Sequence, residues 1–98
     1  MKYSIAVLTF AQNDLREIHE YLSDFGENPP KKFRESFENF IEQVSNMPYM
    51  FSEYGRNPNY RRAVIIFEYL IFYRVDEENN IVKIYRVLHG RRNIKDII

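Results

Sequence analysis

The chain has 98 residues, among them eight phenylalanines and eight tyrosines, no cysteine, and as many Lys and Arg side chains as Asp and Glu side chains. This length suits a single domain over residues 1–98, and the lack of cysteine excludes disulfides and thiolate chemistry. The zero net charge argues against a protein that holds nucleic acid by many phosphates, because such binding needs an excess of basic side chains.

The N-terminal segment, residues 2–8, is apolar and is predicted to form a largely buried strand. Asn13 and Asp14 soon close the apolar stretch, and no small-residue cleavage site follows it. We therefore expect no signal peptide. No stretch approaches the ~20 apolar residues that a bilayer requires, so we also expect no membrane span. A cytoplasmic location fits these expectations and the lack of cysteine.

The next segment is predicted to form a helix that starts after Thr9 and ends at Phe25-Gly26. The Thr9 hydroxyl is expected to cap the first turn, and glycine accepts the left-handed conformation that ends many helices. Apolar side chains recur at helical spacing at Ala11, Leu15, Ile18 and Leu22. The polar residues between them are expected on the solvent side, namely Asp14, Glu17, His19 and Glu20.

A second helix is predicted to start at Asn28-Pro29-Pro30, because proline in the first turn loses no intrahelical hydrogen bond. Met47-Pro48 is expected to end it. The connection between the two helices is short, which favours an antiparallel helical hairpin. The apolar stripe of this helix consists of Phe33, Phe37, Phe40, Ile41 and Val44.

The second half of the chain changes from helices to strands. Residues 49–59, rich in Tyr, Asn, Gly and Pro, are expected to form a loop. Strands are predicted over residues 62–67, 69–75 and 81–88, with a polar turn at 76–80 and a turn or short helical piece at 89–98. Alternation places Tyr69, Ile71, Tyr73 and Val75 on one face of the middle strand and Leu70, Phe72 and Arg74 on the other.

These elements follow the order β-α-α-β-β-β. This order predicts an α+β fold in which a helical hairpin packs on one face of a small, mainly antiparallel sheet. The last strand is apolar on both faces, which favours a central position in the sheet, beside the first strand. The register of the strands stays open at this point.

Charge is distributed unevenly along the chain. Residues 1–55 carry five Lys and Arg against nine Asp and Glu, whereas residues 56–98 carry nine against five. A basic half binds an acidic partner or nucleic acid, or it is only a solvated surface. The chain has no phosphate-binding loop, and with two histidines and no cysteine we expect no metal site and no cofactor.

Seven residues of the basic half fall on strands or strand ends that a meander brings together. Arginines in such a set bind phosphates as bidentate donors, and a histidine near them can transfer protons on RNA. The alternative is that the arginines pair with carboxylates such as Glu68, Glu77 or Asp96. The candidate binding surface consists of Tyr60, Arg61, Arg62, Arg86, His89, Arg91 and Arg92.

Three segments carry a pattern that extends over nearly the whole chain. They are Ala11-x-x-Asp14-Leu15-x-x-Ile18-x-x-Tyr21-Leu22, then Tyr60-Arg61-Arg62 with Tyr69-Leu70-Ile71-Phe72-Tyr73-Arg74-Val75, and finally Ile84-Tyr85-Arg86-Val87-Leu88-His89-Gly90-Arg91-Arg92. In this order they resemble the RelE/ParE superfamily of bacterial toxins. The resemblance implies the toxin of a type II toxin–antitoxin pair, neutralised by a ParD-like or RelB-like antitoxin that folds on its surface and alone contacts DNA.

The same resemblance implies one of two targets. RelE-like toxins cleave mRNA in the ribosome, whereas ParE-like toxins inhibit DNA gyrase and are not known to be nucleases. If the chain is a nuclease, the resemblance assigns catalysis to Arg61, Arg62, His89 and Arg91. An inactive relative that only titrates an antitoxin is a third alternative.

The RelE-like catalytic pattern also has an arginine in the middle strand of the meander and a tyrosine near the C-terminus. These positions correspond here to Leu70 and Ile97. The ending His89-Gly90-Arg91-Arg92 is more similar to ParE-like toxins. The resemblance therefore favours a gyrase inhibitor that acts by binding, with Arg91, Arg92 and the C-terminal segment as its active surface.

Overall fold

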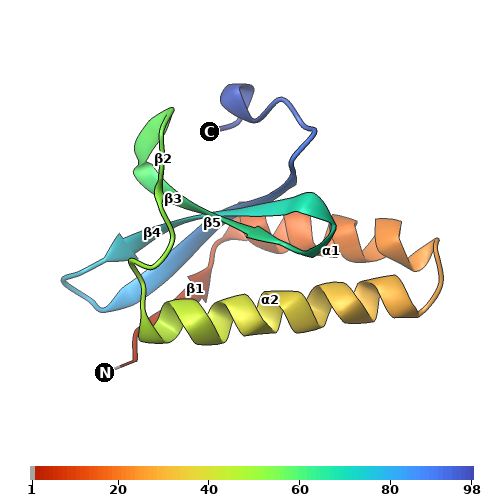
Figure 1. Cartoon of the computed structure of the whole chain (residues 1–98), viewed down its shortest axis with the longest axis horizontal. Coiled ribbons are helices and arrows are strands. Elements are labelled where there is room, and N and C mark those ends of the chain that lie inside the picture. The colour runs from red at the N-terminus through yellow and green to blue at the C-terminus, as the bar shows by residue number, and fades with distance from the viewer. Residues whose placement is uncertain (1) are drawn as a thin grey trace.

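The computed structural model describes residues 2–98 and places two helices on one face of a five-stranded sheet (Figure 1). The strands follow the order β1-β5-β4-β3-β2, with β1 parallel to β5 and the other neighbouring pairs antiparallel. The predicted α+β fold is confirmed, and the last long strand lies inside the sheet, beside the first, as expected. The elements are β1 (Ser4–Val7), α1 (Thr9–Ser23), α2 (Asn28–Asn46), β2 (Glu53–Tyr54), β3 (Asn57–Ile65), η1 (Ile66–Glu68), β4 (Tyr69–Asp76), β5 (Ile81–His89) and η2 (Ile94–Asp96).

The face of the sheet beneath the helices, called the helix face, holds most of the core. The predicted alternation on β4 is confirmed, since Tyr69, Ile71 and Tyr73 are all buried there. Tyr73 keeps its hydroxyl satisfied by donating to the Pro48 carbonyl at 2.8 Å. The helices and the sheet contribute Ala11, Ile18, Leu22, Phe33, Phe40, Val44, Val82, Ile84 and Val87 to the same cluster.

The opposite face, called the tail face, carries a smaller apolar cluster. Its buried members are Leu70, Phe72 and Leu88. The C-terminal segment, residues 90–98, lies on this side of the sheet, away from the helices (Figure 1). It covers the cluster with Ile94, Ile97 and Ile98, and the short helical piece predicted for this segment is η2. The central strands are therefore apolar on both faces.

The segment that was expected to be a loop, residues 49–59, contains β2 and the beginning of β3, so this prediction was wrong. The third strand begins at Asn57 and ends at Ile65, before the predicted end. Phe67 and Glu68 then adopt left-handed conformations with φ of 60° and 62° and turn the chain into β4. Sequence periodicity does not reveal such a turn, because neither residue favours positive φ.

The predicted cap at Thr9 was also wrong. Leu8 still donates its N–H to the Ile84 carbonyl of β5 and stays extended, so α1 begins directly at Thr9 without a side-chain cap. The Gln12 amide donates instead to the Val7 carbonyl at 2.8 Å. The other helix boundaries agree with expectation. Prolines occupy the first turn of α2, and Gly26 follows α1 with φ of 110°.

Candidate binding surface

The adjacent arginines of β3 point to opposite faces of the sheet, because successive side chains of a strand alternate. Arg61 lies on the helix-face side, where it donates to the Phe51 carbonyl at 2.7 Å and stacks over the Tyr49 ring at 4.9 Å. Arg62 lies on the tail face, 5.7 Å from the Tyr54 ring centroid. The structure therefore does not bring these two arginines together, and Arg61 holds the loop that follows α2.

The tail face carries a group of aromatic and cationic side chains beside its apolar cluster. The rings of Tyr60 and Tyr85 meet edge to face with centroids 5.2 Å apart. The Arg74 guanidinium lies 5.8 Å from the first ring and 5.9 Å from the second. Neither Arg62 nor Arg74 forms an ion pair with any residue in the described range 2–98. Both cations are therefore open to an external partner.

Arg74 was missing from the sequence-derived surface although its position carried a signal. It follows Leu70 and Phe72 at period two, so it shares their face of β4. What the sequence left hidden was the register, which places it next to the pair Tyr60 and Tyr85 from the two neighbouring strands.

Asp14 was predicted on the solvent side of α1, but it is buried, with 6% of its surface exposed. Its carboxylate accepts two hydrogen bonds from Arg86, at 2.7 and 2.9 Å, and a third from the Val87 N–H at 2.9 Å. The cause lies in the lengths of the strands. β1 pairs with β5 only as far as Val7 and Ile84, so α1 lies beside the rest of β5 and Asp14 replaces the missing strand partner.

Arg86 is therefore held within the protein rather than offered to a ligand. The hydrogen bonds that Arg86 donates to Asp14, opposed in part by burial, raise the pKa of the Arg86 guanidinium. The Cζ atom of Arg86 lies 5.6 Å from the centroid of the Phe10 ring, and Phe10 is largely exposed. A hollow of about 380 Å³ on this side is lined by Phe10, Tyr60, Tyr85, Arg86, Ile97 and Ile98.

His89 lies away from the arginines of the tail face. Its ring meets Tyr69 edge to face at 5.2 Å, and its Nδ1 accepts the Arg91 N–H at 3.2 Å. It lines a groove of about 730 Å³ at the tip of the helical hairpin. Most of the other side chains that line this groove are apolar and include Tyr21, Leu22, Phe25 and Phe67.

Arg91 and Arg92 follow Gly90 at the end of β5 and are exposed. Gly90 donates its N–H to the Glu68 carbonyl, and a Cβ at this position would lie 3.2 Å from the same oxygen, so the close approach favours glycine. Of the seven predicted residues, the structure places Tyr60 and Arg62 together on the tail face. It brings His89, Arg91 and Arg92 together at the end of β5, where Arg91 lines the same groove as His89 and Arg92 lines a smaller hollow beside it. Arg61 and Arg86 are engaged within the protein.

The two positions that the resemblance matched to polar catalytic side chains of RelE-like toxins are apolar and packed. Leu70 is 9% exposed and belongs to the tail-face cluster, and Ile97 packs against that cluster. Hydrocarbon side chains neither donate nor accept protons, so Leu70 and Ile97 themselves supply no acid–base group. Within residues 2–98, no group of three or more His, Asp and Glu side chains is arranged to hold a metal ion.

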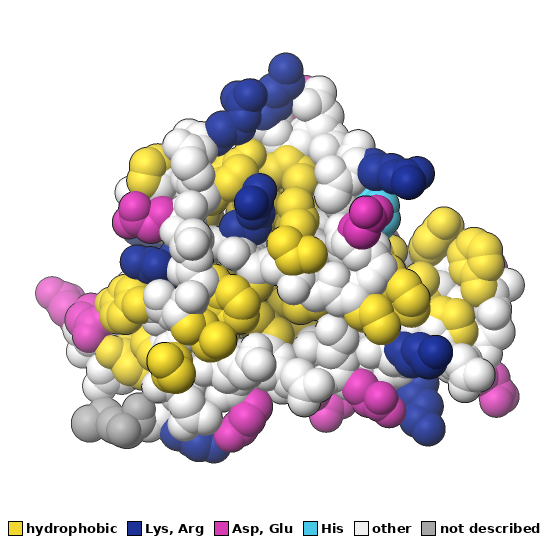
Figure 2. Space-filling model, viewed as in Figure 1, with side chains coloured by type: hydrophobic (Ala, Val, Ile, Leu, Met, Phe, Trp, Pro, Cys, Tyr) yellow, Lys and Arg dark blue, Asp and Glu magenta, His cyan; other side chains and the backbone are white. Residues whose placement is uncertain are grey.

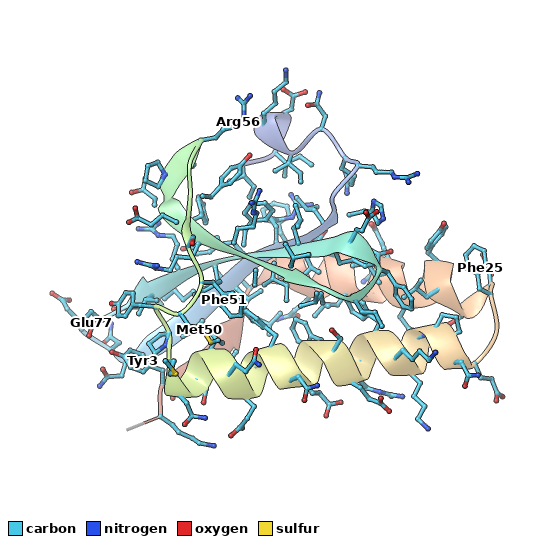
Figure 3. The ribbon with its side chains drawn as sticks, in the orientation of Figure 1. Tyr3, Phe25, Met50, Phe51, Arg56 and Glu77 are labelled. Atoms are coloured by element: carbon cyan, nitrogen blue, oxygen red, sulfur yellow. The ribbon has the colours of Figure 1, made fainter. Side chains whose placement is uncertain are left out.

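At the other end of the sheet, Glu77 in the β4–β5 turn accepts hydrogen bonds from two tyrosines. Figure 3 labels Glu77 and one of them, Tyr3, at this end of the molecule. Tyr3 donates to Glu77 at 2.8 Å, and the Tyr49 hydroxyl donates to its second oxygen. These bonds lower the pKa of the Glu77 carboxyl and, together with burial, raise the pKa of Tyr49 to about 12. The cluster joins the N-terminal strand, the loop after α2 and this turn.

Comparison with known proteins agrees with this architecture. Residues 7–94 match the family model described as the ParE toxin of the type II toxin–antitoxin system parDE. No curated protein sequence matches the chain. No helix within residues 2–98 has the length and apolar character needed to cross a lipid bilayer.

Three solved structures are similar in fold. The RelBE2 toxin–antitoxin complex of Mycobacterium tuberculosis matches with a TM-score of 0.68 and 24% identity, over 91% of this chain and 99% of the other. A mutant of the E. coli toxin RelE in the free state matches with a TM-score of 0.70 and 16% identity, over 99% of this chain and 93% of the other. The chromosomal ParDE system of P. aeruginosa matches with a TM-score of 0.62 and 17% identity, over 90% of this chain and 96% of the other.

Proposed function

Since the family model spans residues 7–94, the chain belongs to the ParE toxin family of type II toxin–antitoxin systems, and we propose that it inhibits DNA gyrase by binding. In this proposal a cognate antitoxin, ParD-like or RelB-like, neutralises the toxin and supplies any contact with DNA. The site of action is the cytoplasm, where gyrase works. Growth arrest on expression of the toxin alone is the expected outcome.

The observation that carries this proposal is the apolar character of the tail face at Leu70 and Ile97. RNA cleavage needs groups that stabilise charge and move protons around the reacting phosphate. Here both positions are occupied by packed hydrocarbon. Arg61, a member of the predicted nuclease set, lies on the opposite side of the sheet. A toxin that acts by occupying its target needs none of these groups.

The surface available for such binding combines aromatic rings with cations that have no carboxylate partner within residues 2–98. Arg62 and Arg74 lie on the tail face, and Arg91 and Arg92 are exposed directly after the end of β5. Arginine and tyrosine side chains contribute most of the binding energy in many protein interfaces, because they combine large contact area with directed hydrogen bonds. The C-terminal segment passes over the same face and adds Ile94, Ile97 and Ile98.

A supercoiling assay with purified gyrase tests the proposal. We expect the toxin to inhibit supercoiling and to trap a cleaved DNA complex. We expect the double variant Arg91→Ala/Arg92→Ala to lose at least about tenfold in potency, as is usual when interface arginines are truncated. Arg34→Ala on α2 is the matched control and should leave potency unchanged. Gyrase activity that is unaffected by excess toxin would contradict the proposal.

Ribosome-dependent cleavage of mRNA is the second candidate, because the exposed arginines at the end of β5 also suit RNA phosphates. Primer extension on translated messages after induction of the toxin distinguishes the two. New cuts within codons would replace the gyrase proposal. Expression with neither growth arrest nor cuts would identify an inactive relative that only binds an antitoxin.

A further inference from the structure

The outer edge of β3 is only partly covered by its neighbour. β2 pairs with β3 at two positions, Glu53 with Arg61 and Tyr54 with Asn57. Along the rest of the strand, β3 has β4 on one side and no strand from residues 2–98 on the other. The chain does not continue β2 further along this edge, because it turns before Phe51, with the Met50 N–H bonded to the Met47 carbonyl.

Two neighbouring hydrogen bonds define which backbone groups point outward at this edge. The Arg62 N–H donates to the Ser52 carbonyl at 3.1 Å, on the side away from β4. The Ile66 N–H donates to the Ser36 hydroxyl of α2 at 3.2 Å. Backbone groups of alternate residues point to the same side of an antiparallel strand. Val64, midway between these residues, therefore directs both its N–H and its C=O away from β4.

The side chains around this position suit a peptide of a particular character. Val64 is 62% exposed on the tail face, beside Arg62, whose guanidinium has no ion pair within residues 2–98. On the other side of the edge, hydrophobic side chains form a band between α2 and the strands (Figure 2). The half-buried members of the core in this region are Phe37, Ile41, Phe51 and Ile65.

We propose that an extended segment of the cognate antitoxin adds to the sheet at Val64, as a strand on the free edge of β3. One residue of that segment would exchange two hydrogen bonds with the Val64 backbone, which only another polypeptide backbone offers at this spacing. The segment would carry an apolar side chain against Val64 and a carboxylate opposite Arg62. This inference rests on the proposed function only in assuming that a cognate antitoxin exists.

Amide hydrogen exchange tests the contact on the unaltered protein. The probe is the purified antitoxin encoded beside the toxin gene. In the complex we expect exchange of the Val64 amide to slow by about 100-fold or more, because it becomes hydrogen-bonded and shielded from water. The Arg62 and Ile66 amides already have acceptors and should change less. A Val64 amide that exchanges equally fast in the complex would overturn the proposal.

Variants at the edge separate the backbone contact from the side chain. Val64→Pro removes only an N–H that points outward, and strands accept proline where the N–H faces away from the sheet. We expect this variant to weaken antitoxin binding by about tenfold, because one hydrogen bond to the antitoxin is lost. Val64→Ala keeps the N–H and should weaken it by less than about threefold. Arg62→Glu should also weaken binding, whereas Arg56→Glu should not. Equal affinities for the proline and alanine variants would contradict strand addition.

The failure of this proposal and that of the proposed function can be told apart. Gyrase inhibition is measured on free toxin, without antitoxin. Antitoxin that binds tightly, leaves the Val64 amide unprotected and tolerates Val64→Pro would exclude strand addition while the gyrase result stands. Conversely, a toxin that spares gyrase but protects this amide in the complex would retain the edge contact and lose only the target.

Discussion

The two faces of the sheet bury side chains in different ways. The helix face is closed by two long helices whose apolar stripes interlock with β4 and β5, and aromatic rings such as Phe40 and Tyr73 are fully enclosed. The tail face is closed by one short segment with three isoleucines, and cations and tyrosines surround its apolar cluster. The first arrangement stabilises the fold, whereas the second leaves a surface that can meet a partner.

The hydrogen bonds of the C-terminal segment sharpen this contrast. Its backbone bonds join residues of the segment to one another or to His89, apart from that of Gly90 to Glu68. Beyond these, the Asn57 side chain donates to the Ile98 carbonyl at 3.4 Å. The segment is therefore held on the tail face mainly by the hydrophobic contacts of its isoleucines, and this cluster contains fewer buried side chains than the cluster beneath the helices.

The largest effect is expected on the helix face. Phe40→Ala should lower the free energy of unfolding by about 3–5 kcal/mol, because the ring is enclosed by Phe37, Phe51 and Tyr73 and its removal leaves a cavity. Urea denaturation measures the change. Phe25→Ala is the control, since that ring is mostly exposed, and should change stability by less than about 0.5 kcal/mol. Similar losses in both variants would contradict the assignment of the core.

The next effect concerns the bond between α1 and the free part of β5. Asp14→Asn should cost about 2–3 kcal/mol, because Arg86 loses its charged partner while still largely covered. The double variant Asp14→Asn/Arg86→Met should recover part of the lost stability, as measured by chemical denaturation. Asp24→Asn, at the exposed end of α1, is the matched control. Equal stability of the Asp14 and Asp24 variants would show that the pair is not important.

A smaller effect is expected from the segment on the tail face. Ile97→Ala/Ile98→Ala should lower stability by about 1 kcal/mol or less, because both side chains are only partly buried and the segment makes few other contacts. Thermal unfolding measures this change, and proteolysis of residues 90–98 should accelerate. A loss as large as that of Phe40→Ala would mean that the tail face also holds the main core.

The smallest effect is expected at the cluster around Glu77, and it should depend on pH. Hydrogen bonds lower the pKa of Glu77 in the folded protein, so its contribution is present above the unfolded value of about 4.3 and is lost as the pH falls. The pKa of Tyr49 is raised to about 12, so its contribution lasts to about pH 10 and is lost as the pH rises through about 12.

Tyr49→Phe removes this hydrogen bond and tests the pH dependence. The difference in melting temperature from the unaltered protein should be small at neutral pH and should shrink below about pH 4. The control is Tyr21→Phe, because Tyr21 is exposed and its hydroxyl forms no hydrogen bond within residues 2–98. A difference that grows on acidification would contradict a lowered pKa of the Glu77 carboxyl in the folded protein.

Much of the fold was predictable because it follows from local periodicity. The stripes of α1 and α2 and the alternation on β4 are properties of sequence spacing, and the two-sided apolar pattern of β5 correctly indicated its central position. The family was predictable from three short segments. The candidate surface was predicted less well, because spacing along a strand tells which residues share a face but not which strands and registers bring them together.

The sequence by itself determined the element order, the helical hairpin, the central strand and the apolar residues at positions 70 and 97. Only the tertiary structure decided that Asp14 is buried, because this depends on β1 ending before β5 does. Only it decided that Arg74, rather than Arg61, joins Tyr60 on the tail face, and that Val64 faces an open edge. These outcomes depend on strand length and pairing, which are settled by packing between distant parts of the chain.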